Sequence, residues 1–244
     1  MEAPITRISL WSGPRNISTA MMYSFAQRKD TKVFDEPLYG YYLKNSKAKE
    51  YHPGAEEIIN TMETDGRKVV DMMLTNREKP VLFFKNMTHH LLPGLDRSFL
   101  KHLVNVILTR DPVEMLPSYA EVVETPSLYD VGYKLHLDIV EQLQAENLPV
   151  IVLDSKAVLL NPKEQLQKLC DAINIPFDPV MLSWSPGARP EDGCWAKYWY
   201  GNIHTSSGFI SYHPKTTPFP EKLKPLLEEC LPFYEKLERF KLKT

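Results

Sequence analysis

The sequence predicts a three-layer α/β fold, in which helices cover both faces of a central, mainly parallel β-sheet. Two observations support this prediction: short apolar runs rich in β-branched residues recur along the chain, and segments with helical periodicity separate them. The runs show little alternation of polar and apolar residues, which is typical of strands buried on both faces. The 244 residues are enough for one such domain with a sizeable core, so we expect a single domain over 1–244.

The predicted strands and helices alternate along the chain. In order, the strands are Ile5–Trp11, Lys32–Phe34, Val81–Phe84, Val104–Thr109 and Val150–Leu153. The helices, where apolar residues recur every three or four positions, are Ser18–Gln27, Gly54–Glu63, Val113–Val123, Val131–Ala145 and Pro162–Ile173. Strand, crossover helix and strand in repetition favour parallel pairing.

The composition changes after Ser183. Several Trp and Tyr residues crowd into an irregular stretch with Pro and Gly, over 184–217. Long loops in compact domains often carry function, so we expect this stretch to cover a binding site. A charged amphipathic helix over 221–240 is predicted near the end of the chain.

Charge and composition argue against several classes of protein. The 29 Lys and Arg nearly balance the 31 Asp and Glu, whereas a nucleic-acid-binding domain is usually basic, so we expect no nucleic-acid partner. No apolar run approaches the roughly 20 residues that span a bilayer, and the N-terminal residues do not read as a secretory signal, so no membrane partner is expected. The three cysteines form no CxxC pair and predict neither a zinc site nor a disulfide framework, which favours a cytoplasmic location.

The first predicted strand ends in a turn with the features of an anion site. Residues 12–19 read SGPRNIST, and a helix follows. At such a turn the backbone N–H groups and the positive end of the helix dipole point at one place. Arg15 adds a fixed positive charge, while Asn16, Ser18 and Thr19 add polar side chains. Helix capping needs only one of these residues, so the cluster favours an anion-binding loop.

A second polar motif follows the fourth predicted strand. Arg110 comes first, Asp111 suits the N-cap of the next helix, Glu114 has the spacing of a capping box, and Ser118 lies about two turns along. A kinase would have an acidic residue at this strand end to hold Mg²⁺. A Walker A motif is also absent, because Ile17 stands where that motif has its lysine. The pattern therefore suits a metal-free site for a polyanion.

Together the two motifs resemble those of the sulfotransferases that use 3′-phosphoadenosine 5′-phosphosulfate (PAPS). In that family the first loop commonly reads PKSGTT or PRSGTT, and Pro14–Thr19 reads PRNIST here. The second motif, RDP followed by a serine, has the family's spacing. The resemblance implies a sheet of P-loop NTPase-like topology, PAPS as the donor, adenosine 3′,5′-bisphosphate as the product, and no metal. It further implies a hydroxyl or amine acceptor on a small molecule or a carbohydrate, and it sets no oligomeric state.

The same resemblance implies roles for individual residues. Arg15 corresponds to the basic residue at the 5′-phosphosulfate, and Ser18 and Thr19 to its hydroxyl donors. Arg110 and Ser118 match the pair that holds the 3′-phosphate.

One further segment resembles the family's nucleotide-binding residues, and two positions differ from the family's pattern. Residues 187–199, GARPEDGCWAKYW, are similar to the family's loop over the nucleotide, which would place Arg189 there. Ile17 replaces the usual Gly within the cofactor-binding loop, and Ala20 replaces a frequent Trp. Because of these departures, a catalytically weak nucleotide-binding module stays open, as does a nucleotide-dependent phosphotransferase.

Two segments offer a catalytic base. Lys85 and the following NMTHHLLP are similar to the KTHLP of cytosolic sulfotransferases, where the Lys contacts the transferring group and the His is the base. That likeness favours Lys85 and His89 as catalytic residues, with His90 as an alternative base. Glu36 is the rival, in FDEPLY, which is similar to the EPL segment of carbohydrate sulfotransferases. Burial that raised its pKa toward neutrality would suit it to take the proton of a hydroxyl.

Overall fold

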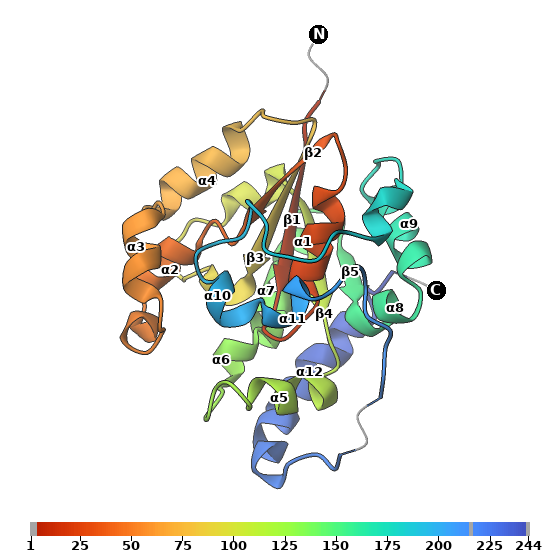
Figure 1. The fold of residues 1–244 in the computed structure, drawn as a ribbon. Coiled ribbons are helices and arrows are strands. Elements are labelled where there is room, and N and C mark those ends of the chain that lie inside the picture. Colours follow the sequence, from red (N-terminus) through yellow and green to blue (C-terminus); the bar gives the residue numbers. More distant parts are fainter. Residues whose placement is uncertain (1–3, 215–216, 243–244) are drawn as a thin grey trace.

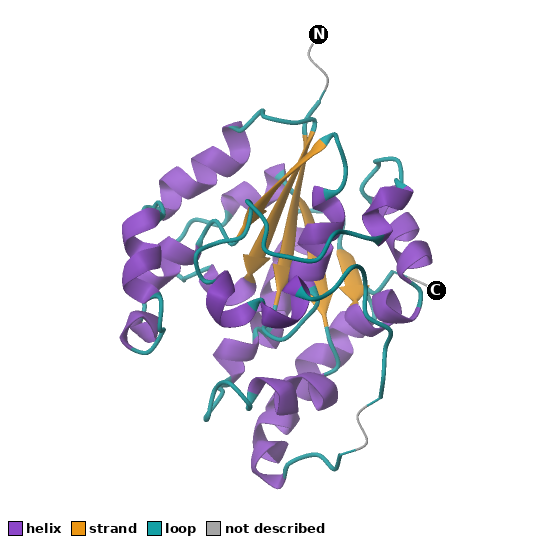
Figure 2. Cartoon of the chain, in the orientation of Figure 1, coloured by secondary structure: helices purple, strands orange, loops and turns teal. Residues whose placement is uncertain are grey.

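A five-stranded parallel sheet forms the centre of the computed structural model, which describes residues 4–214 and 217–242. In spatial order the strands are β2 (Thr31–Asp35), β3 (Val81–Met87), β1 (Thr6–Ser12), β4 (Val104–Thr109) and β5 (Ile151–Asp154). All neighbouring strands in this order pair in parallel (Figure 1, Figure 2). The predicted fold class, a parallel sheet between helices, is confirmed.

The helices connect the strands and extend beyond them. They are α1 (Ser18–Ala26), α2 (Tyr39–Asn45), α3 (Ala55–Thr61), α4 (Gly66–Thr75), α5 (Pro112–Tyr119), α6 (Leu128–Val131), α7 (Tyr133–Ala145), α8 (Ser155–Leu160), α9 (Pro162–Ala172), α10 (Ala196–Trp199), α11 (Gly201–His204) and α12 (Lys224–Glu238). Short 3₁₀ turns lie at Lys47–Glu50, Thr88–His90, Ser98–His102, Pro179–Leu182 and Glu221–Leu223.

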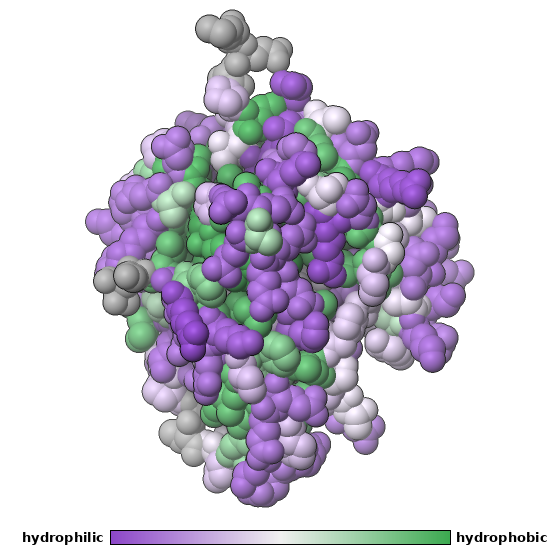
Figure 3. Space-filling view, turned by 180° about the vertical axis from the view of Figure 1, so that it is seen from behind, coloured by the Kyte–Doolittle hydropathy of each residue, from purple (hydrophilic) through white to green (hydrophobic). Residues whose placement is uncertain are grey.

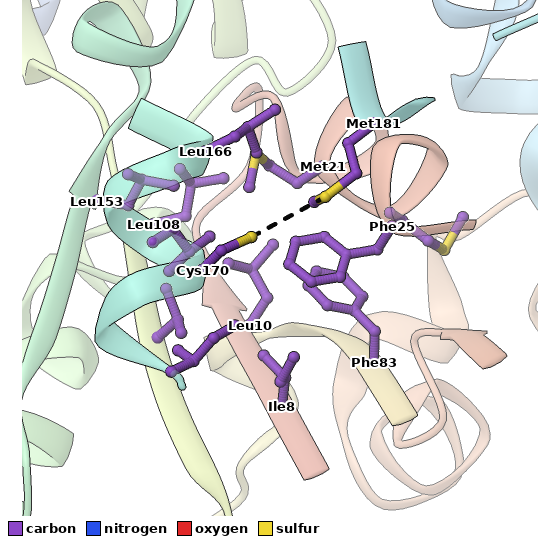
Figure 4. Close-up of a cluster of buried hydrophobic side chains, with 14 of the residues drawn as sticks. Ile8, Leu10, Met21, Phe25, Phe83, Leu108, Leu153, Leu166, Cys170 and Met181 are labelled. Carbon is purple, nitrogen blue, oxygen red and sulfur yellow. Dashed lines mark hydrogen bonds between the residues drawn. The ribbon is translucent and has the colours of Figure 1, made fainter. Parts of the chain in front are cut away.

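Each face of the sheet is covered by its own apolar layer. Helices α1, α8 and α9 pack on one face, around a cluster that Figure 4 shows in close-up. There the rings of Phe25 and Phe83 stack with centroids 4.3 Å apart. The sulfur of Cys170 points into the same cluster, 4.0 Å from that of Met181, and burial raises the pKa of its thiol to about 11. Cys170 is therefore a core residue, protonated at neutral pH.

Helices α4, α7 and α12 cover the opposite face. Because side chains alternate along a strand, Leu10 of β1 belongs to the first layer, whereas its neighbour Trp11 belongs to the second. The outer surface seen from behind is largely hydrophilic, with apolar side chains visible between the polar ones (Figure 3). Within the described residues, no helix combines the length and apolar character that a membrane span requires.

Some element boundaries differ from those predicted, for physical reasons. The helix predicted over Val131–Ala145 is α7, which begins two residues later, because Gly132 has φ +79°, a left-handed conformation that favours glycine and separates α7 from the preceding α6. Strand β3 continues three residues beyond the predicted Phe84. Its polar residues are buried with partners, such as Asn86, whose Nδ2 donates to Ser9 Oγ at 2.9 Å. Six helices were not predicted: α2, α4, α6, α8, α10 and α11.

The irregular stretch after Ser183 runs over the carboxyl ends of the strands and contains α10 and α11 (Figure 1). We call residues 184–214 the cover segment; residues 215 and 216 of the predicted stretch lie outside the described residues. Two of its buried aromatic side chains, Trp195 and Tyr200, pack with residues of α2 and α3, whereas Trp184 belongs to the cluster around α1. The helix predicted over 221–240 is present as a 3₁₀ turn followed by α12.

Candidate active site

A cavity of about 800 Å³ opens at the carboxyl ends of β1–β4, beneath the cover segment. This is where ligands bind in open parallel sheets. Its lining includes ten of the residues singled out in the sequence: Arg15, Asn16, Ile17, Ser18, Thr19, Glu36, Lys85, His89, Arg110 and Ser118. Four separate segments of the chain thus bring their polar side chains to one space.

The loop between β1 and α1 forms one wall of this cavity. Arg15 has φ +51°, a conformation uncommon for non-glycine residues, and it turns the chain into the helix. Asn16 fixes the loop from inside: its Nδ2 donates to Leu108 O at 3.0 Å, and its Oδ1 accepts from Ile17 N–H at 3.0 Å. Among the described residues no side chain caps the start of α1. The N–H groups at this helix end therefore remain available to an anion.

The two anion motifs predicted from the sequence are in direct contact. Arg15 Nε donates to Ser118 Oγ at 3.1 Å, and an Arg110 guanidinium nitrogen donates to Arg15 O at 2.7 Å. Two guanidinium groups and a serine hydroxyl therefore lie together at one end of the cavity. We refer to this group as the anion end.

Glu114 also lies at the anion end, and it does not form the capping box that its spacing predicts. Asp111 caps α5 as expected, by accepting from Val113 N–H at 2.8 Å. The Glu114 carboxylate instead accepts from Tyr212 of the cover segment at 2.5 Å and lies 3.8 Å from Arg110 Nε. The capping-box prediction is wrong because these partners, distant in sequence, compete for the carboxylate.

A buried network of charged side chains lies at the ends of β2 and β3. Lys85, 2% exposed, donates from Nζ to Asp35 at 2.8 Å, to Glu36 at 2.5 Å and to the Tyr200 hydroxyl at 2.7 Å. Tyr200 in turn donates to Asp35 at 2.7 Å. Asp35 and Tyr200 were not among the predicted site residues. The crowding of aromatic residues in the cover segment was the only sign of Tyr200.

Glu36 is held in an unusual backbone conformation with its side chain at the cavity. Its φ is +46°, and its N–H donates to Lys85 O at 2.8 Å. Non-glycine residues in this region of φ concentrate at functional sites. Burial and the neighbouring Asp35 raise the pKa of Glu36 to about 7, although Lys85 acts in the opposite direction.

The two adjacent histidines have different surroundings. His89 lines the cavity, its buried Nδ1 has no partner within the described residues, and burial lowers its pKa to about 4. The ring of His90 packs against those of Tyr39 and Tyr42, with centroids 4.5 and 4.6 Å away. Its Nε2 lies 3.9 Å from the second carboxylate oxygen of Glu36. Both imidazoles are neutral at physiological pH.

Arg189 is the one predicted site residue that does not line the cavity. Its guanidinium lies 4.9 Å from the ring centroid of Tyr23 on α1 and pairs with Glu191 at 3.0 Å. Nearby, Asp192 accepts hydrogen bonds from Tyr23 at 2.8 and 2.9 Å. In this structure, Arg189 therefore helps to hold the cover segment on α1.

No cluster of three or more His, Cys, Asp or Glu with the geometry of a metal site is found in the described part of the chain. The positive charges that line the cavity are those of Arg15, Lys85 and Arg110. Arg15, Arg110 and the uncapped N–H groups at the start of α1 can stabilise negative charge in this cavity.

Residues 6–240 match the family model described as the sulfotransferase domain. The chain belongs to the sulfotransferase family. Among curated proteins, this sulfotransferase is similar to two from Arabidopsis thaliana, branched-chain-amino-acid aminotransferase-like proteins 2 and 1. They are 38% and 40% identical to it over 93% of its length. The chain spans about 40% of the length of each of these relatives.

Solved structures of sulfotransferases share the fold. The sulfotransferase domain from the curacin biosynthetic pathway has 17% identity and a TM-score of 0.51, with 93% of this chain and 98% of that chain covered. The domain from the Synechococcus PCC 7002 olefin synthase has 14% identity and a TM-score of 0.52, with coverages of 94% and 95%. A sulfotransferase from Alicyclobacillus acidocaldarius has 10% identity and a TM-score of 0.54, with coverages of 96% and 94%.

Proposed function

We propose that this sulfotransferase transfers the sulfuryl group of PAPS to a hydroxyl or amine of a small-molecule acceptor. The observation that carries the proposal is the single cavity, which joins the anion end to a buried carboxylate whose pKa is near neutrality. A donor with two anionic groups needs positive charge at one end of the cavity. An acceptor that loses a proton needs a base at the other end.

The residues at the anion end fit a nucleotide with phosphate groups at two positions. Arg110 and Ser118 would hold the 3′-phosphate, and Arg15, Ser18 and Thr19 the 5′-phosphosulfate. Arginine suits this task because its guanidinium makes charge-assisted, bidentate hydrogen bonds to phosphate oxygens. PAPS supplies the activated sulfuryl group, and the product is adenosine 3′,5′-bisphosphate.

Glu36 is proposed as the general base. The acceptor oxygen forms a bond to sulfur as the bond from sulfur to the 5′-phosphate oxygen breaks, and the acceptor proton goes to Glu36. A pKa of about 7 suits a base that works near neutral pH. His89, with a pKa of about 4, is the weaker base, and we assign it a role in orienting the acceptor.

The part of the cavity beside Glu36, which we call the acceptor end, favours a small, uncharged acceptor over an anionic carbohydrate. Tyr39, Tyr42 and Trp199 line it with aromatic rings. Its cation, Lys85, is already paired with two carboxylates. An anionic sugar chain would lack the positive partners that such ligands require.

A transfer assay tests the proposal together with its metal independence. The protein would be incubated with PAPS labelled in the sulfuryl group and a mixed acceptor extract, with and without EDTA. We expect labelled product in both, because Arg15, Arg110 and the N–H groups of α1 supply the positive field. Absence of labelled product, with phosphoryl transfer from ATP once Mg²⁺ is added, would favour the alternative phosphotransferase, and tight nucleotide binding with neither transfer would favour a binding module.

A further inference from the structure

We propose that Lys85 is a positioning residue: within a closed network with Asp35 and Tyr200, it sets the place and charge of the Glu36 carboxylate and does not contact the transferring group. This inference rests on the proposed function, in which Glu36 is the base. It departs from the role that the sequence resemblance implies for Lys85.

The hydrogen-bond capacity of Lys85 is fully used inside the protein. A lysine ammonium has three N–H donors and no acceptor. The three have partners within 2.8 Å, namely Asp35, Glu36 and the Tyr200 hydroxyl. No N–H donor is therefore left to reach a sulfuryl oxygen. The side chain is also only 2% exposed, so it has little access to a bound donor.

The charges of the network leave Glu36 poised between its two protonation states. One ammonium faces two buried carboxylates, so the group carries one excess negative charge. The other groups facing Glu36 are neutral near pH 7: His90 of the 3₁₀ turn, Tyr39 of α2 and Tyr200 of the cover segment. Asp35 therefore raises the pKa of Glu36 and Lys85 lowers it.

The cover segment completes this network. Asp35 accepts from Tyr200 at 2.7 Å and from the Gly193 N–H at 3.1 Å, while Trp195 Nε1 donates to the Tyr200 hydroxyl at 3.3 Å. The segment that covers the cavity thus also supplies partners to the charges behind Glu36.

The test is a direct titration of the Glu36 carboxyl carbon by NMR of glutamate-labelled protein, with Glu36→Gln to assign the signal. Asp35→Asn should lower the pKa of Glu36 and Lys85→Met should raise it, each by about one pH unit or more. Asp138→Asn, which alters a surface carboxylate paired with Lys134 at 3.0 Å, should leave it unchanged. Asp35→Asn keeps the test decisive if Lys85→Met fails to fold.

Steady-state kinetics then distinguish a positioning role for Lys85 from direct contact between Lys85 and the transferring group. The acid limb of kcat/KM should follow the measured pKa of Glu36 in each variant, while the KM for PAPS in Lys85→Met stays within a fewfold of the parent value. A Glu36 titration that is the same in Asp35→Asn as in the parent would overturn the proposal. So would a large rise in the KM for PAPS in Lys85→Met. Altered Glu36 titrations in a protein that transfers no sulfuryl group would support the network and contradict the proposed function instead.

Discussion

Replacement of Glu36 by Gln should lower turnover by about 10²–10⁴-fold, the usual effect of losing a general base. The amide keeps the size of the side chain but cannot take the acceptor proton. Affinity for adenosine 3′,5′-bisphosphate should stay nearly unchanged, because Glu36 lies at the acceptor end of the cavity. Turnover at saturating PAPS and calorimetric titration with the bisphosphate measure the two quantities separately.

His89→Ala is the matched comparison for Glu36→Gln. We expect it to keep activity within a fewfold, since a neutral imidazole with a pKa of about 4 contributes little as a base. The parent enzyme should lose activity as pH falls through about 7, where Glu36 becomes protonated. If His89→Ala abolishes turnover while Glu36→Gln keeps it, or if activity persists down to about pH 4, the histidine is the base.

Arg110→Ala should weaken binding of adenosine 3′,5′-bisphosphate by roughly tenfold to more than a hundredfold. The lost contact is a hydrogen bond between charged groups, worth about 1.5–3 kcal/mol, and each 1.4 kcal/mol is about tenfold in affinity. Adenosine 5′-phosphate lacks the 3′-phosphate, so its affinity should hardly change. Calorimetry with both nucleotides measures the difference.

The comparison of the two nucleotides also controls for damage to the loop. Arg110 donates to Arg15 O at 2.7 Å, so its removal could disturb the 5′ side as well. Ser118→Ala removes a hydroxyl that accepts from Arg15 Nε at 3.1 Å but leaves Arg110 and its bond to Arg15 O in place, and it should show the same selectivity at smaller magnitude. Equal losses for both nucleotides would contradict the assignment of Arg110 to the 3′-phosphate.

The sheet and the anion end were predictable from the sequence because their signals are local. A buried strand, a polar turn and a helix start follow one another within residues 5–27, and the same holds where Arg110 follows β4. Parallel strands end at one edge of the sheet, which is why the separate motifs meet. Glu36 was proposed from the likeness of FDEPLY to the EPL segment of carbohydrate sulfotransferases, and in the structure it directly follows β2.

The other site residues depend on contacts between distant segments. Lys85 was expected to follow a strand, but it lies within β3 because Asp35, Glu36 and Tyr200 satisfy its charge there. Tyr200 is 115 residues away from Lys85 along the chain. Arg189 was placed on the nucleotide by motif resemblance, whereas its contact with Tyr23 depends on how the cover segment packs on α1.

The most direct test of the central claim is calorimetric titration of the protein with adenosine 3′,5′-bisphosphate and, separately, with ATP and Mg²⁺. A PAPS-dependent sulfotransferase should bind the bisphosphate without metal and more tightly than it binds ATP with Mg²⁺, because Arg110 and Ser118 are placed for a 3′-phosphate that ATP lacks. Tighter binding of ATP with Mg²⁺, or no binding of the bisphosphate, would contradict the account.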